Sequence, residues 1–274
     1  MSIAASAKVH PSSVLSPDVE LGPDVEIGPY CLIQGKVKIG KGSFIEGHVT
    51  VGSRYGIVEI GENNHLCPGA VIGGPPQDVS YKGEPTKLII GNNNVFREFS
   101  TVNLASAKGD CKTVIGNNCY LMAYVHVGHD CRLGNNVIMA NDTNLGGHCE
   151  IGDHVVISAM CGLNQFTKVG NYAFIAGSSI VNKDIIPFSR AHGNYALIRA
   201  TNKVGLSRAG YSREEVANIH KAIRILVMGS LTVEEGISVI LSECQPGVLV
   251  DELIQFIRTS KRGIALNRGS NSAE

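Results

Sequence analysis

The chain has 274 residues, with 24 Lys and Arg against 24 Asp and Glu, so its net charge predicts neither nucleic acid nor an anionic membrane surface as a partner. Trp is absent, aromatic residues make up 5% and Gly occurs 32 times, which is typical of many small, repeated packing units. The N-terminus does not resemble a secretory signal, and no stretch approaches the ~18 consecutive apolar residues of a membrane helix. The eight cysteines are scattered without a CxxC pair, so we expect reduced thiols in a cytoplasmic protein with no integral membrane segment.

Aliphatic residues recur at every sixth position over most of the chain. The first run has ten members, from Ile3 to Ile57, and the last has twelve, from Ile115 to Val181. Between these runs the frame slips and resumes in two shorter pieces. A six-residue period is neither that of an isolated strand nor that of a helix, and it indicates a parallel β-helix of hexapeptide repeats.

Each hexad is interpreted as a short strand plus a turn, and three hexads close one triangular coil of about 18 residues. Successive coils stack at the strand spacing of about 4.8 Å. The repeating aliphatic residue and the small residue four positions later are expected to point inward. Five cysteines occupy that small inward position, and we interpret them as small buried hydrophobic residues: Cys31, Cys119, Cys131, Cys149 and Cys161.

Two polar segments interrupt the hexads, a Pro- and Gly-rich loop over 73–88 and a shorter segment over 104–112. Insertions in a solenoid form loops on one face, which is often the binding face. The hexads end near Pro187, and apolar residues then recur at helical spacing. The sequence therefore predicts a mainly β chain, with a β-helix over 1–189 and a small α-helical domain over 190–274.

Capping signals divide the C-terminal segment into helices. Ser212 and Glu215 match a capping box before an apolar-periodic run, and Thr232 and Glu235 match a second one. A third helix is predicted over 248–258, after a Pro-Gly pair that ends the second.

With a coil of 18 residues, side chains 18 positions apart lie above one another. His129 is then stacked with Gly147 and Gln165, and Asp130 with His148. His126 lies between two inward-pointing valines, so strand alternation predicts that its side chain points outward. The predicted patch on the outer surface also contains His126, Asn164 and the backbone of Gly146.

The patch is suited to acyl transfer. His129 can act as a general base on a substrate hydroxyl or amine, and Asp130 can set its orientation or charge. A glycine N–H beside it can hold the developing oxyanion. Two other interpretations remain open: polar turn residues that are merely solvated, and a zinc site built from His126, His129 and His148, as in carbonic anhydrases of this fold. The stacking of His148 on Asp130 rather than on a histidine disfavours zinc, so we expect no metal.

The order of these motifs resembles a known family, the UDP-N-acetylglucosamine O-acyltransferases that begin lipid A synthesis. Hexads are shared by many acyltransferases, whereas the order of the QD loop, HxxHDC, GGH, QF and VGLxRxG is specific. The resemblance covers essentially the whole chain. The segments that carry it are VHPSSVLSPDVELGPDVEIGPYC, GGPPQDVSYKGEPT, FREFSTVN, VHVGHDC, LGGHCEIGD, NQFTKVG, GNYALIRATNKVGLSRAGYS and SKRGI.

The resemblance implies a left-handed parallel β-helix that forms a homotrimer, with active sites in clefts between neighbouring β-helices. Members of the family transfer an (R)-3-hydroxyacyl group from acyl carrier protein to the 3-position hydroxyl of UDP-N-acetylglucosamine, the first step of lipid A biosynthesis. No dissociable cofactor is implied, because 4'-phosphopantetheine arrives with the donor. Lys261 and Arg262 could contact the acidic carrier protein or form a solvated basic pair.

The motif match implies a role for each matched residue. His129 would be the general base, Asp130 its partner and the Gly147 N–H the oxyanion donor. Asn202 and Arg208 match positions that hold the nucleotide. The residues implied to line the sugar and acyl sites are Gln77, Asp78, His126, His148 and Gln165, with Asn164 beside them.

Four positions bear on the substrates. Gly177 matches the position that measures acyl length, and a glycine there suggests a longer chain. Ser80 stands where a lysine is common, Asn164 where a histidine is common, and Val204 where some members carry a glutamate. An amide cannot take the charge of an imidazolium. The acceptor could therefore be a 3-amino UDP-sugar, giving an amide, and a β-helix that binds a nucleotide sugar without turnover is a further alternative. The His129–Asp130 pair favours an enzyme.

Overall fold

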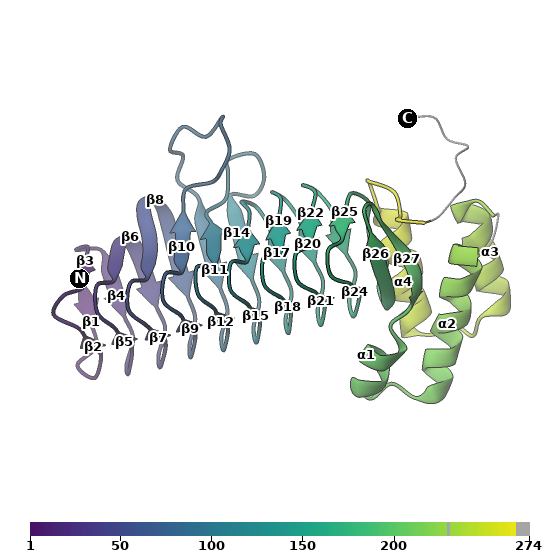
Figure 1. The fold of residues 1–274 in the computed structure, drawn as a ribbon, viewed down its shortest axis with the longest axis horizontal. Helices are drawn as coiled ribbons and strands as arrows, with labels where there is room; N and C mark the ends of the chain where they lie inside the picture. Colours follow the sequence, from purple (N-terminus) through teal and green to yellow (C-terminus); the bar gives the residue numbers. More distant parts are fainter. Residues whose placement is uncertain (229–230, 267–274) are drawn as a thin grey trace.

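The computed structural model describes residues 1–228 and 231–266. Short parallel strands wind into a β-helix that leads from the N-terminus to a group of helices at the other end (Figure 1). The chain visits three faces of this β-helix in turn. The predicted fold class is confirmed.

The strands fall on three faces according to their pairing. The first face contains β1 (Ser2–Ile3), β4 (Val19–Leu21), β11 (Lys87–Ile90), β14 (Lys112–Ile115), β17 (Arg132–Leu133), β20 (Glu150–Ile151) and β23 (Lys168–Val169). The second contains β2 (Lys8–Val9), β5 (Glu26–Ile27), β7 (Phe44–Ile45), β9 (His65–Leu66), β12 (Val95–Phe96), β15 (Tyr120–Leu121), β18 (Ile138–Met139), β21 (Val156–Ile157) and β24 (Phe174–Ile175). The third contains β3 (Val14–Leu15), β10 (Val71–Gly74), β13 (Thr101–Asn103), β16 (His126–Val127), β19 (Asn144–Leu145), β22 (Gly162–Leu163) and β25 (Ile180–Val181). Two longer strands, β6 (Leu32–Ile39) and β8 (Thr50–Ile60), run from the third face onto the first.

The register between coils is the one that the hexads predict. His126 in β16 pairs with Asn144 in β19, which pairs with Gly162 in β22, so each coil advances by 18 residues. The offset grows to 25 between Thr101 and His126, where the shorter segment is inserted. Both insertions therefore leave the stacking of neighbouring coils intact.

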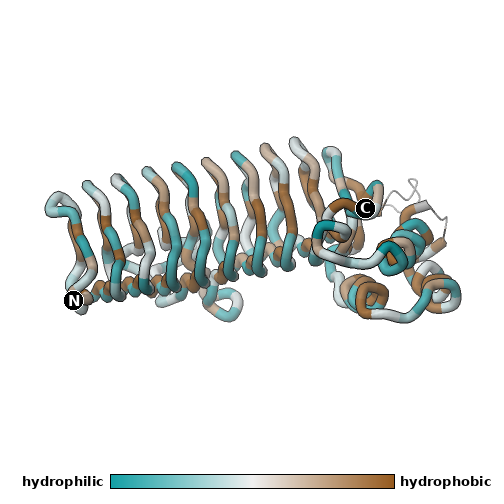
Figure 2. The backbone as a smooth tube through the Cα atoms, turned by 90° about the horizontal axis from the view of Figure 1, so that it is seen from below, coloured by the Kyte–Doolittle hydropathy of each residue, from teal (hydrophilic) through white to brown (hydrophobic). Residues whose placement is uncertain are grey.

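The inward positions form one continuous apolar core. Hydrophobic residues recur at the same places in every coil, so rows of them follow the axis of the β-helix (Figure 2). The five cysteines assigned to the small inward position are all buried in this core, which confirms their interpretation. At the N-terminal end Ile3 stays 41% exposed, because no coil covers it.

Ile57 was expected to point inward, and this prediction is wrong. Ile57 is only partly buried, whereas Val58 and Ile60 are 1% and 3% exposed. The pairing of β6 with β8 shifts register between Gln34 and Lys36. The frame therefore slips before Ile57, because extra residues are accommodated where β8 passes from the third face to the first.

The three corners of the β-helix carry different residues. At the corner between the first and second faces, side-chain oxygens accept hydrogen bonds from backbone N–H groups of the neighbouring coil; we call it the asparagine corner, formed by Asn92, Asn117, Asn135, Asp153 and Asn171. The corner between the second and third faces, the aromatic corner, exposes Tyr30, Phe99, Tyr124 and Met160. Both insertions emerge at the corner between the third and first faces, which we call the loop corner (Figure 1).

Beyond the β-helix the chain forms a hairpin and helices. β26 (Ser189–Gly193) pairs in parallel with β24, and β27 (Ala196–Thr201) pairs antiparallel with β26. The helices are α1 (Lys203–Arg208), α2 (Arg213–Met228), α3 (Val233–Glu243) and α4 (Val248–Thr259). The two capping boxes are confirmed, as Ser212 and Glu215 exchange hydrogen bonds and so do Thr232 and Glu235. The boundary at residue 189 stays a prediction, and residues 267–274 of the predicted domain lie outside the described residues.

None of the described helices combines the length and apolar character needed to cross a membrane.

Two neighbouring residues of β18 test the inward and outward assignment. Met139 is fully buried and Ile138 is 37% exposed. Met139→Ala should lower the free energy of unfolding by about 2–5 kcal/mol, because it leaves a cavity in the core. Ile138→Ala should cost about 1 kcal/mol or less. Chemical denaturation of both variants measures the difference, and equal losses would contradict the assignment.

Candidate active site

The loop corner collects most of the polar residues that the sequence singles out. Strands β16, β19 and β22 end there one above another. The turns that follow these strands carry, in order, His129 and Asp130, Gly147 and His148, and Asn164 and Gln165. The predicted stacking therefore brings these residues to one edge of the molecule.

His129 and Asp130 form a hydrogen-bonded pair. His129 Nδ1 lies 2.7 Å from Asp130 Oδ2. The Asp130 side chain is 3% exposed and that of His129 is 14% exposed, so little water competes for the contact. Because the carboxylate accepts a hydrogen bond from Nδ1–H, the lone pair of Nε2 is left to accept a proton.

The backbone of Gly147 lies directly against the His129 ring. A Cβ atom at Gly147 would lie 2.7 Å from His129 Nε2, so a larger residue cannot fit without moving the ring. The neighbouring N–H groups form hydrogen bonds between adjacent coils, since the Gly146 N–H donates to Leu163 O and the His148 N–H donates to His129 O. Within the described residues the Gly147 N–H has no acceptor, and it is a free donor beside the histidine.

The shorter inserted segment covers Asp130. The Ser106 N–H donates to Asp130 Oδ2 at 3.0 Å, and the Asp130 N–H donates to Thr113 Oγ1 at 2.8 Å. Burial raises the pKa of Asp130, but hydrogen bonds from His129 and Ser106 outweigh it and hold the pKa below its ordinary value. The buried carboxylate therefore stays ionised at neutral pH.

His148 forms the second imidazole of the cluster. Its Nε2 lies 3.5 Å from Asp130 Oδ2, and its ring stands edge-on to that of His129. Phe166 stacks on the other side, with ring centroids 4.5 Å apart and planes 11° apart. Burial lowers the pKa of His148, and the Asp130 charge only partly opposes this. A neutral His148 can therefore bind a polar substrate group.

An ion pair joins the two inserted segments. Lys108 Nζ lies 2.7 Å from Asp78 Oδ2, while the N–H and the hydroxyl of Ser80 donate to Asp78 Oδ1. The hydrogen bond from Lys108 holds the pKa of Asp78 well below its usual range. Gln77, next to this pair, is exposed. The sequence did not single out Lys108, because the two segments are distant in the chain and no motif links them.

His126 lies on the third face, one turn before His129. Its Nδ1 is 2.8 Å from Thr101 Oγ1 of the neighbouring coil. Burial, and then the charge of His129, lower the pKa of His126. This imidazole therefore lies on the third face, beside the loop corner.

The C-terminal segment reaches the loop corner. Arg262 donates to Gln165 O at 3.0 Å and to Asn182 O at 3.1 Å. The side chains of Asn164 and Gln165 remain exposed. Together with Asp130 and His148, Lys261 and Arg262 line a hollow of about 260 Å³.

Three predicted residues lie away from the loop corner. Asn202 caps α1 by accepting a hydrogen bond from the Gly205 N–H, and it donates to Tyr172 O at the asparagine corner. Arg208 is exposed at the end of α1. Gly177 follows β24 and lies at the aromatic corner. A single chain therefore does not bring these three residues to His129.

The three-histidine zinc site is not formed by the described residues. At the loop corner the group of ligand atoms that lie within 4.8 Å of one another consists of His129, Asp130 and His148, and His126 does not belong to it. Asp130 Oδ2 already accepts hydrogen bonds from His129 and from the Ser106 N–H.

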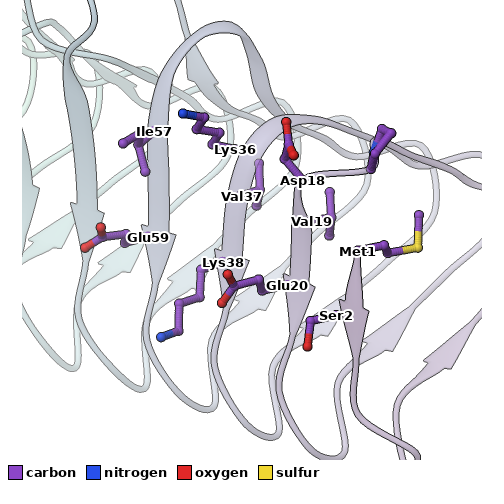
Figure 3. A pocket seen from close by; sticks show the side chains of 11 residues that line it. Met1, Ser2, Asp18, Val19, Glu20, Lys36, Val37, Lys38, Ile57 and Glu59 are labelled. Carbon is purple, nitrogen blue, oxygen red and sulfur yellow. The ribbon is translucent and has the colours of Figure 1, made fainter.

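A separate hollow of about 540 Å³ opens on the first face at the N-terminal end (Figure 3). Its lining includes Lys36, Lys38, Glu20 and Glu59, so charges of both signs alternate along it. None of the predicted site residues lines this hollow.

Comparisons with known proteins show the family of this chain. The family model described as "Udp N-acetylglucosamine O-acyltransferase; Domain 2" matches residues 184–265, and the model of bacterial transferase hexapeptide repeats matches residues 18–53 and 112–147. A relative named acyl-[acyl-carrier-protein]–UDP-N-acetylglucosamine O-acyltransferase, from Thermodesulfovibrio yellowstonii, is 44% identical over 94% of this chain and 98% of its own length. One of the same name from Sulfurihydrogenibium is 54% identical over 73% of this chain and 74% of its own length.

Solved structures match in the same way. The UDP-N-acetylglucosamine acyltransferase of Bacteroides fragilis gives a TM-score of 0.90 with 37% identity, covering 93% of this chain and 98% of that one. The UDP-N-acetylglucosamine acyltransferase of Campylobacter jejuni gives a TM-score of 0.88 with 39% identity, covering 95% of this chain and 100% of that one. On these similarities over nearly its whole length, the chain belongs to the family of acyl-[acyl-carrier-protein]–UDP-N-acetylglucosamine O-acyltransferases.

Proposed function

We propose that the protein transfers an (R)-3-hydroxyacyl group from acyl carrier protein to the 3-position hydroxyl of UDP-N-acetylglucosamine, in the first step of lipid A biosynthesis. Donor, acceptor and reaction class follow from the family. The observation that carries the chemistry is the position of His129, whose Nδ1 lies 2.7 Å from Asp130 Oδ2 while its ring lies against the backbone of Gly147, a residue with a free N–H.

The reaction assigns one step to each of these groups. His129 Nε2 removes the proton from the sugar hydroxyl as its oxygen attacks the thioester carbonyl. The Gly147 N–H donates to the oxygen that becomes negative in the tetrahedral intermediate. When the C–S bond breaks, the imidazolium returns the proton to the thiolate of the donor. Asp130 stays ionised and stabilises the positive charge on His129 between the two proton transfers.

Other residues of the loop corner hold the substrates in this proposal. A neutral His148, fixed by Phe166, can hydrogen-bond the sugar without adding a second positive charge beside His129. Asp78 is oriented by Lys108 and Ser80, so its carboxylate presents a fixed acceptor. The residues that would contact sugar and acyl chain are Gln77, Asp78, His126, His148, Asn164, Gln165 and Gly177.

The hydroxyl acceptor is favoured over a 3-amino UDP-sugar. The relatives are named as O-acyltransferases, and several are at least 36% identical over most of this chain. One of the departures that suggested an amine, Ser80, donates its N–H and its hydroxyl to Asp78, and this contact does not depend on whether the acceptor is a hydroxyl or an amine.

We further propose that no dissociable cofactor is needed, because the 4'-phosphopantetheine arm comes with the carrier protein. Lys261 and Arg262, which line the hollow beside Asp130, give an acidic carrier protein a basic contact next to the site. All eight cysteines are free, which is compatible with a cytoplasmic location.

A homotrimer would complete the site. Asn202 and Arg208, which match the nucleotide positions, lie away from His129 within one chain, so a neighbouring chain would have to supply them. Exposed apolar side chains gather along the third face and the aromatic corner: Val14, Leu32, Val71, Tyr30, Phe99, Tyr124 and Met160. Packing copies against this surface would cover them.

A product assay tests the reaction. Purified protein is given UDP-N-acetylglucosamine or its 3-amino analogue, each with a series of 3-hydroxyacyl carrier proteins of different chain length, and products are identified by mass spectrometry. We expect acylated UDP-N-acetylglucosamine, with a preference for longer acyl chains because Gly177 leaves space. Product from the amine alone would contradict the proposed acceptor.

Gly147→Ala tests the contact with His129. The added Cβ would lie 2.5 Å from His129 Cε1, so the ring must move and kcat should fall by about a hundredfold. Gly247→Ala is the control, because nothing lies within 4 Å of the added atom. Steady-state kinetics and thermal melting separate catalysis from stability. Unchanged kcat in Gly147→Ala would argue against this arrangement.

Mixed trimers test whether the site is shared. His129→Ala and Arg208→Ala are each expected to be nearly inactive alone at low UDP-sugar concentration. If neighbouring chains supply the two residues, a co-refolded equal mixture should regain about a quarter of normal activity, the share of sites with both residues intact. No recovery from properly assembled mixtures would place both residues in one chain's site.

A further inference from the structure

The second face carries a cluster that the proposed reaction does not use. His65 Nε2 lies 2.6 Å from Glu46 Oε1 and 3.8 Å from Cys67 Sγ. These ligand atoms all lie within 4.8 Å of one another. A carboxylate, an imidazole and a thiol from two adjacent coils therefore converge on one point, far along the chain from His129.

Cys67 differs from the cysteines of the core. The inward cysteines, such as Cys131, lie in the apolar core and donate to backbone carbonyl groups. Cys67 is 3% exposed but does not belong to that core. It follows the inward-pointing Leu66, and its Sγ atom faces the side chains of His65 and Glu46. Packing of the β-helix therefore does not by itself account for a thiol at this position.

The three side chains are held by regular structure. Phe44 pairs with His65 across β7 and β9, and their rings stack with centroids 5.3 Å apart. The Glu46 N–H donates to Leu66 O, and the Cys67 N–H donates to Phe96 O. Hydrogen bonds and strand pairing between coils thus hold the backbone of all three residues. Less conformational entropy is therefore lost when they bind a ligand.

We propose that Glu46, His65 and Cys67 bind a divalent cation of the zinc class. Nitrogen, thiolate sulfur and carboxylate oxygen are the ligands that zinc prefers. Tetrahedral zinc places such a nitrogen about 3.4 Å from the oxygen and about 3.6 Å from the sulfur. The separations here, 2.6 Å and 3.8 Å, reach these values with side-chain shifts of less than about 1 Å.

The surroundings favour a cation. Glu46 supplies a negative charge, and the nearby Arg97 guanidinium is neutralised by two hydrogen bonds to Glu98. The side chains of His65 and Glu46 are 40% and 31% exposed, so an ion can enter from solvent and keep water as a fourth ligand. A reactive thiolate is the weaker interpretation, because burial and then the Glu46 charge raise the pKa of Cys67 to about 11.

Cobalt(II) is the probe, because a thiolate ligand gives it a charge-transfer band in the near ultraviolet. The full-length protein, freed of metal with a chelator, should bind one equivalent of Co²⁺ with this band, and Zn²⁺ should displace it. Cys67→Ala should lose the band, and His65→Gln should weaken binding at least about tenfold. Zn²⁺ should raise Tm of the unaltered protein and leave that of Cys67→Ala unchanged.

Two control variants locate the ion. Cys161→Ala removes a buried core thiol and should keep the band. His129→Ala removes an imidazole of the cluster at the loop corner and should keep the band as well. Circular dichroism confirms that each variant is folded. Loss of binding in His129→Ala, an unchanged band in Cys67→Ala, or no binding by the unaltered protein would each overturn the proposal.

Discussion

The register of the parallel ladder is the constraint on which the rest of the structure depends. Each coil advances by 18 residues, so a side chain at a given turn position meets the same position in the next coil, as His126 meets Asn144. Aliphatic side chains fill the inside, and backbone hydrogen bonds between coils are satisfied on every face. A one-residue slip would turn the inward residues outward, so burial of the core fixes the register strongly.

The candidate active site follows from that register with little further construction. His129 and Gly147 occupy one turn position in adjacent coils, and the absence of a side chain at Gly147 lets the imidazole lie on its backbone. The inserted segments then supply what the repeat cannot. The Ser106 N–H donates to the buried carboxylate of Asp130, and together with the larger effect of the hydrogen bond from His129 it holds the pKa of Asp130 below its ordinary value. The regular coils thus position the reacting groups, and the shorter inserted segment helps to keep Asp130 ionised.

The sequence predicts the repeating part of the molecule well and the irregular part poorly. A period of six residues identifies the inward positions, and the stacking of His129 with Gly147 follows by counting. Ile57 was misassigned because it is aliphatic and fits the first run. A shift of the six-residue frame becomes visible in the sequence only where the next run begins. The contact of Lys108 with Asp78 joins segments that obey no period, so no pattern could reveal it. The helix α1 and the β26–β27 hairpin were missed because short elements at the end of a solenoid are stabilised by tertiary packing rather than by local preference.

The central claim is that His129 is the base that removes the acceptor proton. Chemical rescue of His129→Ala measures this most directly, with acyl transfer to UDP-N-acetylglucosamine followed as a function of added imidazole. The account predicts that turnover is lost while binding of the nucleotide sugar is kept, and that imidazole restores part of the rate in its neutral form, because the cavity left beside Gly147 admits it. Turnover by His129→Ala at the rate of the unaltered protein would contradict the claim.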